Sequence, residues 1–173
     1  SANWNNAQTV TVTGVDDALE DGGQTYKIII SSSTSSDAGY NGINPSDQTV
    51  INQDNDLPGI VIIPDPSKSS LSSITEIGGQ DTFTVVLRTQ PTDDVNFTLQ
   101  SKDTSEGVVS PTSLTFTNAN WDAPQTVTVT GVDDAIIDGD QVFKIDLSRA
   151  SSNDPDYDRM NPLDVKVQCI DDE

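Results

Sequence analysis

The sequence contains no histidine, and this absence excludes several kinds of chemistry. Ser-His-Asp and Cys-His nucleophile systems cannot form, and neither can a histidine-based pH switch. Zinc and copper sites are disfavoured, because nitrogen and sulfur ligands are scarce. The single cysteine, Cys169, cannot form an intrachain disulfide, and we expect it to be a small buried apolar residue. These observations predict a protein that is not an enzyme.

Apolar and basic residues are also few. Hydrophobic residues make up 33% of the 173 residues, and no apolar run approaches the roughly 18 residues of a membrane span. Lysine and arginine number 8 against 28 aspartate and glutamate residues, for a net charge of −20. Such a surface repels nucleic acid and anionic membranes over most of its extent. We therefore expect no nucleic-acid partner and no membrane insertion.

The chain repeats itself. Residues 2–56 align without a gap to residues 119–173, at a constant offset of 117, with 28 identities in 55 pairs. We therefore expect residues 1–57 to be the C-terminal half of a preceding repeat, and residues 58–173 to be a complete repeat. The neighbouring repeats of the same protein are then the first expected partners. The short acidic segment between the two, which ends at Pro58, suits a stiff junction better than a loose linker.

The apolar residues alternate with polar ones, which is typical of half-buried strands. Val127 and Val129 lie between threonines, and Phe143 and Ile145 flank Lys144. Gly, Pro, Asn and Asp clusters separate such segments, and no stretch has a helical period. The pattern predicts an all-β chain, an immunoglobulin-like antiparallel β-sandwich with about seven strands per repeat. The expected strands are residues 60–63, 83–88, 95–99, 114–116, 127–132, 143–147 and 165–167.

The half repeat presents a physical problem. It supplies about three strands, whose apolar face at Val10, Val12, Tyr26 and Ile28 has no opposing sheet. We expect that face to be covered, either by the complete repeat or by strands of a neighbouring copy.

Clustered carboxylates are the most informative chemical feature. The loop 133–140 has acidic residues at four of its eight positions, and Ca²⁺ is the cation that takes six to eight such oxygens. EF-hand spacing is absent. Solvated turns of an acidic surface are the alternative, but the recurrence of the clusters favours Ca²⁺. The complete repeat offers Asp133, Asp134, Asp138, Asp140, Asp171 and Asp172, and the half repeat offers Asp16, Asp17, Asp21, Asp54 and Asp56.

These motifs carry a resemblance to a known family. The segment from Ser113 to Trp121, the run from Pro124 to Asp134, and the later acidic residues resemble the Calx-beta domain, which occurs in tandem in large bacterial surface proteins. The resemblance covers residues 58–173, and residues 1–57 match its second half. It implies Ca²⁺ at one pole of the sandwich, with Glu76 as the early glutamate and Asp103 as the mid-domain aspartate.

The sequence departs from the pattern of this family at two points. Asp138 stands where the family often has glutamate, which leaves its carboxylate one methylene short. The half repeat has no counterpart of Glu76 or Asp103, so its site is incomplete unless a partner donates oxygens.

The expected function is mechanical: a Ca²⁺-stiffened spacer in an extracellular, cell-surface adhesion protein. The first alternative is a subunit of an extracellular filament or sheath, a homo-oligomer completed by strand exchange with a neighbouring chain. The second alternative is a carbohydrate-binding accessory module that uses Trp4 and Trp121, although packing is the more ordinary role for these residues.

Overall fold

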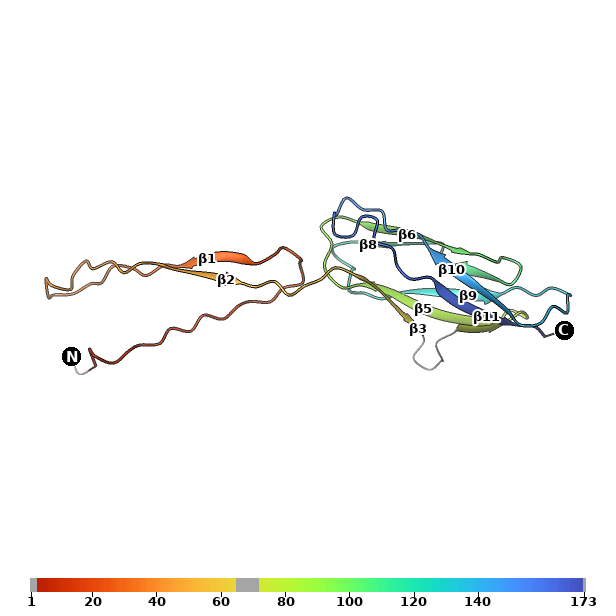
Figure 1. Cartoon of the computed structure of the whole chain (residues 1–173), viewed down its shortest axis with the longest axis horizontal. Coiled ribbons are helices and arrows are strands. Elements are labelled where there is room, and N and C mark those ends of the chain that lie inside the picture. Colours follow the sequence, from red (N-terminus) through yellow and green to blue (C-terminus); the bar gives the residue numbers. More distant parts are fainter. Residues whose placement is uncertain (1–2, 65–71, 173) are drawn as a thin grey trace. The chain divides into compact units, whose positions relative to one another are not determined.

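β-Strands make up the regular secondary structure of this computed structural model, which describes residues 3–64 and 72–172. Eleven strands and no helix are found in the described residues, so the chain is all-β as predicted. No helix in these ranges is long and apolar enough to cross a membrane. The chain divides into two compact units, and the boundary between them in the sequence lies between Asn55 and Asp56 (Figure 1).

The second unit is an immunoglobulin-like β-sandwich, as the alternation predicted. One sheet has the strand order β4-β11-β10-β6-β8, and the other has the order β3-β5-β9-β7. Neighbouring strands are antiparallel, except that β4 runs parallel to β11. The strands are β3 (Ile60–Pro64), β4 (Ser72–Thr75), β5 (Gln80–Leu87), β6 (Val95–Ser101), β7 (Gly107–Ser110), β8 (Ser113–Phe116), β9 (Gln125–Gly131), β10 (Gln141–Leu147) and β11 (Val165–Ile170).

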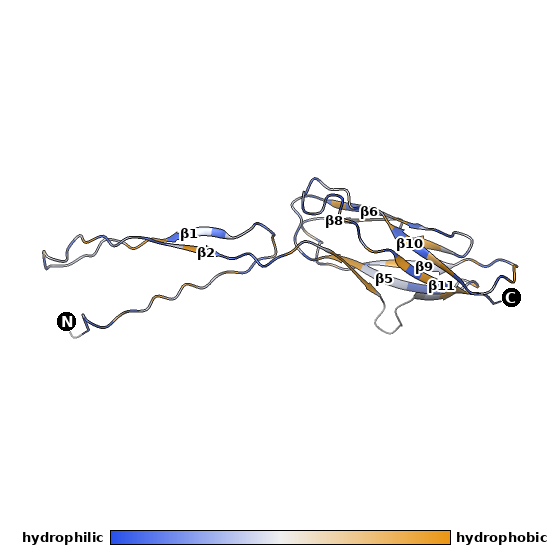
Figure 2. Ribbon diagram, in the orientation of Figure 1, coloured by the Kyte–Doolittle hydropathy of each residue, from blue (hydrophilic) through white to orange (hydrophobic). Residues whose placement is uncertain are grey.

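The core lies between the two sheets and follows the alternation of the sequence. Val95, Phe97 and Leu99 of β6 are buried, as are Val127 and Val129 of β9. Figure 2 shows hydrophobic and hydrophilic residues alternating along β10 and β11. Burying one such side chain contributes about 1.5–3 kcal/mol, and this apolar interface holds the two sheets together.

The second unit has nine strands rather than the expected seven. The additional strands, β4 and β7, are four residues long and carry few apolar side chains, so their alternation is too short to be recognised. The expected strand over residues 127–132 ends at Gly131, and Val132 is only half-buried. The two additional strands matter for function, because β4 ends and β7 begins at the acidic end of the sandwich.

The first unit contains two strands, β1 (Gln24–Ile28) and β2 (Gln48–Asn52), which form an antiparallel hairpin. The third expected strand, which carries Val10 and Val12, is absent, and residues 9–13 are in no strand. Its counterpart β9 pairs with β5 and β7, and the first unit contains no equivalent of either strand. Val10, Val12 and Tyr26 are exposed, so this unit has no opposing sheet of its own.

Candidate metal centre

Two buried glutamates lie at one end of the second unit. Glu76 follows β4 and is 2% exposed, and Glu106 precedes β7 and is 5% exposed. A carboxylate oxygen from each and the sulfur of Cys169 all lie within 4.8 Å of one another. Within the described part of the chain, Oε2 of each glutamate has no hydrogen-bond partner. Buried unpaired carboxylates are costly, so this pair calls for a proton or a cation.

The position of Glu76 is set by close contacts between strand ends. Its backbone N–H donates to the carbonyl of Ile170, the last residue of β11, at 3.3 Å. Gly131 ends β9 beside it, where a Cβ atom would collide with the carbonyl oxygen of Thr75. The absence of a side chain at Gly131 therefore lets the end of β4 approach the start of the acidic loop.

Glu106 is held by the same two strand ends. Its carbonyl accepts a hydrogen bond from the backbone N–H of Val132 at 3.1 Å and a weaker one from the thiol of Cys169 at 3.3 Å. Val132 opens the acidic loop, and Cys169 lies in β11. Segments distant in the sequence thus bring Glu76 and Glu106 together.

The electrostatic potential at Glu76 is strongly negative, because several carboxylates lie near it. Burial raises the pKa of Glu76 to about 7, and repulsion by Glu106, Asp171, Asp134 and Asp138 contributes to the same shift. Asp134 and Asp138 belong to the loop between β9 and β10, and Asp171 follows β11. Three predicted ligands therefore act electrostatically on a fourth.

Burial and neighbouring carboxylates also raise the pKa values of Glu106 and Cys169. Burial raises the pKa of Glu106, repulsion by Asp138, Asp103 and Asp134 adds to the effect, and a side-chain hydrogen bond with Glu76 opposes it. Burial and the two glutamates raise the pKa of the Cys169 thiol to about 11. The cysteine is therefore a buried neutral thiol, in agreement with its expected role as a small apolar residue.

The acidic loop is folded back onto the end of β11. Oδ2 of Asp171 accepts a hydrogen bond from the backbone N–H of Gly139 at 2.7 Å, and Oδ1 of Asp134 accepts one from that of Ile136 at 2.7 Å. The φ angle of Gly139 is 73°, a conformation that glycine adopts at little cost. In Figure 1 this loop and the C-terminal end of β11 lie at the same end of the second unit.

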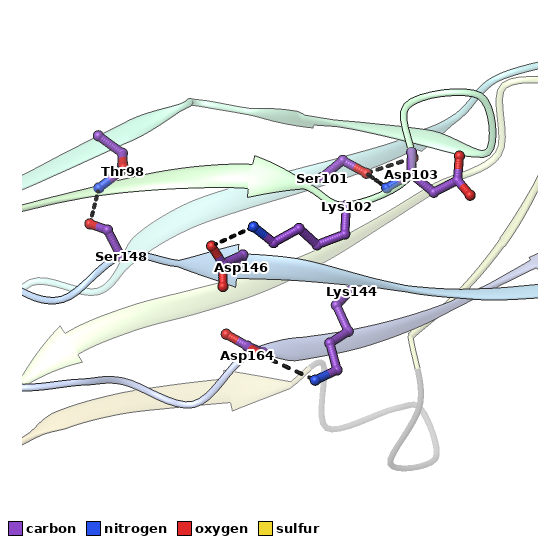
Figure 3. A network of polar contacts seen from close by, with 8 residues as sticks. All are labelled: Thr98, Ser101, Lys102, Asp103, Lys144, Asp146, Ser148 and Asp164. Carbon is purple, nitrogen blue, oxygen red and sulfur yellow. Dashed lines mark hydrogen bonds and ion pairs between the residues drawn. The ribbon is translucent and has the colours of Figure 1, made fainter.

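Asp103 reaches this region from the loop after β6. The hydroxyl of Ser101 donates to the carbonyl of Asp103 at 2.7 Å, and Oδ1 of Asp103 accepts a hydrogen bond from the hydroxyl of Ser105 at 2.6 Å. These contacts fix a tight turn, and Figure 3 shows the carboxylate pointing away from the ammonium group of Lys102.

Two lysines near this turn in Figure 3 form ion pairs with aspartates outside the predicted site. Lys102 contacts Asp146 at 2.9 Å, and Lys144 contacts Asp164 at 3.5 Å (Figure 3). Their side chains lie over β10 and β11 and extend away from Asp103. Neither of these lysines is directed at the turn that carries the Asp103 carboxylate.

The remaining predicted ligands of the complete repeat are more peripheral. Asp133, Asp140 and Asp172 are exposed, and Oδ2 of Asp140 accepts a hydrogen bond from Nε2 of Gln168 at 3.0 Å. Asp172 contributes to the raised pKa of Cys169, which places it near the end of the site. Asp103 and Asp138 are exposed as well, so the two groups differ in their electrostatic effect on the glutamates and not in exposure.

Glu106 was missed by the sequence analysis. It directly precedes β7, the short strand that was also missed, so nothing in the alternation marked it as inward-facing. Its residue type was a usable signal, because the chain has 4 glutamates among 28 acidic residues. Glu76 and Glu106 are the glutamates in the described part of the second unit, and both are buried.

In the first unit, one contact joins predicted acidic residues that are distant in the sequence, and no glutamate among the described residues of this unit is buried. Oδ2 of Asp54 accepts hydrogen bonds from the backbone N–H groups of Asp21 and Gly22 at 3.0 and 2.8 Å. Oδ1 of Asp17 accepts one from that of Leu19 at 2.9 Å, and Asp16 is exposed. Asp56 is half-buried and belongs to the second unit.

No known family profile matches the sequence, and no curated protein matches it. Among solved structures, the chain is similar to the apo form of the Calx CBD1 domain, with 20% identity over 66% of this chain and 98% of that one, at a TM-score of 0.46. It is similar to CBD12 from CALX1.2, with 20% identity over 64% of this chain and 45% of that one, at a TM-score of 0.45. It is also similar to domains 4 and 5 of the S-layer protein SbsC, with 16% identity over 96% and 87% of the two chains, at a TM-score of 0.39.

Proposed function

We propose that the chain is a calcium-binding segment of an extracellular tandem-repeat surface protein, in which Ca²⁺ binds at the acidic end of the second unit. The observation that carries this proposal is the buried pair Glu76 and Glu106, each with an Oε2 atom that lacks a hydrogen-bond partner among the described residues. A hard divalent cation with a preference for oxygen satisfies both atoms at once.

The donor set fits calcium in type and number. Glu76 and Glu106 would provide the inner oxygens, and Asp103, Asp134, Asp138 and Asp171, which come from three segments of the chain, raise the pKa of one or both glutamates. Ca²⁺ takes six to eight oxygens in flexible geometry, which six carboxylates can supply. The cation would offset the repulsion that raises the pKa values of both glutamates. The protonated thiol of Cys169 would remain a neighbour, because sulfur is a poor ligand for a hard cation.

The consequence of binding is mechanical. Ca²⁺ that binds the folded chain and not the unfolded chain adds RT ln(1 + [L]/Kd) to stability, about 2.7 kcal/mol at 100 times Kd. It would also fix the acidic loop and the end of β11, where the chain leaves the unit. We therefore propose a spacer that neighbouring repeats extend and that Ca²⁺ stiffens in adhesion at the cell surface.

The test is thermal melting in excess Ca²⁺ and in chelator. Asp134→Asn removes a charge that acts on both glutamates, and it should reduce the Ca²⁺-dependent rise in Tm. Asp140→Asn is the matched control, because it removes the same charge from the same loop at an exposed residue that faces Gln168. Equal rises in both variants and the wild type would place the site elsewhere. The absence of any rise in the wild type would mean that the carboxylates are solvated turns.

A sugar-binding role is less well supported by the side chains. Trp121 is half-buried and packs against the core, and its carbonyl accepts a hydrogen bond from the backbone N–H of Leu87 at 3.1 Å. A sugar platform needs the face of the ring to be free. The packing role expected for both tryptophans therefore remains the better interpretation of Trp121, whereas Trp4 is 84% exposed.

A further inference from the structure

The first unit reproduces the strand pairing of half of the second unit. In β1 and β2 the register runs from Gln24 opposite Asn52 to Ile28 opposite Gln48. Adding the repeat offset of 117 gives the register of β10 and β11, where Gln141 lies opposite Cys169 and Ile145 lies opposite Val165. The hairpin therefore forms with the same alignment in both units.

The hydrogen bonds outside the strands also recur at this offset. Asp54 accepts from the N–H of Gly22 at 2.8 Å, as Asp171 accepts from Gly139 at 2.7 Å. The N–H of Gly42 donates to the carbonyl of Ser33 at 2.8 Å, and its counterpart Arg159 donates to Ala150 at 2.9 Å. The backbone of residues 22–54 is thus shaped as its counterpart is within the complete sandwich.

The burial of equivalent side chains is opposite in the two units. Val10 is 80% exposed and its counterpart Val127 is fully buried, and Tyr40 is 65% exposed where Tyr157 is 1% exposed. The sequences are the same at these positions, so the difference comes from what covers them. Exposed apolar area of this kind, on a backbone already shaped for packing, marks an interaction surface.

The second unit shows what covers these positions. β9 pairs with β5 and β7, and β10 pairs with β6. The hydroxyl of Tyr157 donates to the carbonyl of Thr89 at 2.9 Å. Every one of these partners belongs to residues 80–110, in the first half of the repeat. The interface between the two halves of the second unit therefore defines a template for the surface on the first.

We infer that the first unit is a docking surface for a β-segment with the strand pattern of residues 58–118 of this chain. Docking would reproduce, on the first unit, the interface seen between residues 58–118 and 119–172 of the second unit. Residues 9–13 would then become a strand that pairs with a partner strand on each side. A second copy of the whole chain is a poor occupant, because its own residues 58–118 are already packed against its residues 119–172. Exchange between two copies would expose as much apolar surface as it covers.

The docked segment would also bring counterparts of Glu76 and Glu106 to Asp17, Asp21 and Asp54. These three residues are equivalent to Asp134, Asp138 and Asp171, which act on the glutamates in the second unit. This consequence rests on the proposed calcium site, but the docking itself does not. A packing readout therefore tests docking independently of Ca²⁺.

The experiment is an extended chain in which a second copy of residues 58–118 is joined ahead of residue 2. Hydrogen exchange should show new protection at the amides of Val10 and Val12, which lie outside any strand in the 173-residue chain. In a Trp121→Phe background Trp4 is the sole tryptophan, and its emission should shift to shorter wavelength with reduced quenching by acrylamide. Both measurements are made in chelator.

Two variants keep the result interpretable. Val12→Asp in the extended chain should abolish the new protection, because the counterpart position, Val129, is fully buried. Tyr26→Phe provides a second version of the extended chain. The ring tip of the counterpart Phe143 lies against Gly107, and a tyrosine hydroxyl would crowd the copied glycine there.

Three outcomes test the inferred docking surface. Protection and a Trp4 shift that Val12→Asp removes would support the inference. No protection at Val10 and Val12 in either version of the extended chain would overturn it. Protection in the unmodified 173-residue chain, with a doubled mass in light scattering, would show that a second copy is the occupant and would overturn the inferred occupant.

Discussion

Oδ2 of Asp171 accepts a hydrogen bond of 2.7 Å from the backbone N–H of Gly139. This bond joins the residue after β11 to the acidic loop, 32 positions earlier in the sequence. The same carboxylate contributes to the raised pKa of Glu76. Asp171 therefore has two separable roles, a structural acceptor and a source of negative charge at the site.

Two substitutions separate these roles. Asp171→Ala removes the acceptor and should lower the free energy of unfolding in chelator by about 1 kcal/mol. Asp171→Asn keeps an oxygen acceptor and removes the charge, so in chelator it should be at least as stable as the wild type. Both should lose part of the stabilisation by Ca²⁺. Urea unfolding in chelator and in Ca²⁺ measures this, and equal destabilisation of both variants in chelator would contradict the division of roles.

The raised pKa of Glu76 predicts how stability depends on pH without Ca²⁺. The ordinary pKa is 4.5 and the folded value is about 7, so between these values the folded chain keeps a proton that the unfolded chain has released. Stability should therefore fall as pH rises from about 4.5 to about 7, and should level off on either side of this window. The raised pKa of Glu106 acts in the same direction. Urea midpoints measured across the window in chelator test the slope.

Glu76→Gln is the informative variant for this slope. It removes the carboxyl group that titrates, so the decline between about pH 4.5 and 7 should become smaller, and the variant should be more stable than the wild type at the upper end. Asp140→Asn should leave the slope unchanged. Saturating Ca²⁺ should reverse the trend in the wild type, because the cation competes with protons for the same oxygens. A wild-type slope that Glu76→Gln does not alter would assign the titration to other groups.

The thiol of Cys169 should be inert in the folded chain. Its pKa is raised to about 11, and the residue is fully buried, so little thiolate is present and reagents have no access. An aromatic disulfide reagent should label the chain only after denaturant is added, with one thiol per chain. Rapid labelling in native buffer would show that the end of β11 opens readily.

The sequence predicted the sandwich well because its long strands alternate clearly. Residues such as Phe97 and Val129 have polar neighbours on both sides, and both are buried as expected. β4 and β7 were not predicted, since β4 has a single apolar residue and the two valines of β7 are adjacent, so neither segment alternates as β8 does. Strand formation at residues 9–13 was wrongly predicted for the opposite reason. The alternation there is clear, but a strand also needs partners, and these are distant in the sequence.

The candidate site was predictable in its acidic loop and not in its buried centre. Repetition at an offset of 117 singled out Asp134, Asp138 and Asp171, which the structure relates electrostatically to Glu76. Glu106 has no counterpart in the half repeat, so repetition gave no information about it. Its burial depends on the approach of Val132 and Cys169 from other strands, which composition and spacing do not encode.

Tyr157 and Tyr40 are equivalent by the repeat and should respond differently to the same substitution. The hydroxyl of Tyr157 donates to the carbonyl of Thr89 at 2.9 Å, lies 2.8 Å from Oγ1 of Thr89, and accepts from the N–H of Thr89 at 3.1 Å. Tyr157→Phe leaves these buried groups without their partner and should cost about 1–3 kcal/mol of unfolding free energy.

Tyr40→Phe is the matched control, because Tyr40 is exposed and its substitution should change stability by less than about 0.5 kcal/mol. In the extended chain with a docked first half, the same substitution should become costly, since Tyr40 would then meet a copy of Thr89. Urea unfolding of the wild type and of Tyr40→Phe, each with and without the added segment, measures both effects. A Tyr40→Phe cost that is the same with and without the added segment would mean that the docked half does not reproduce the interface seen in the second unit.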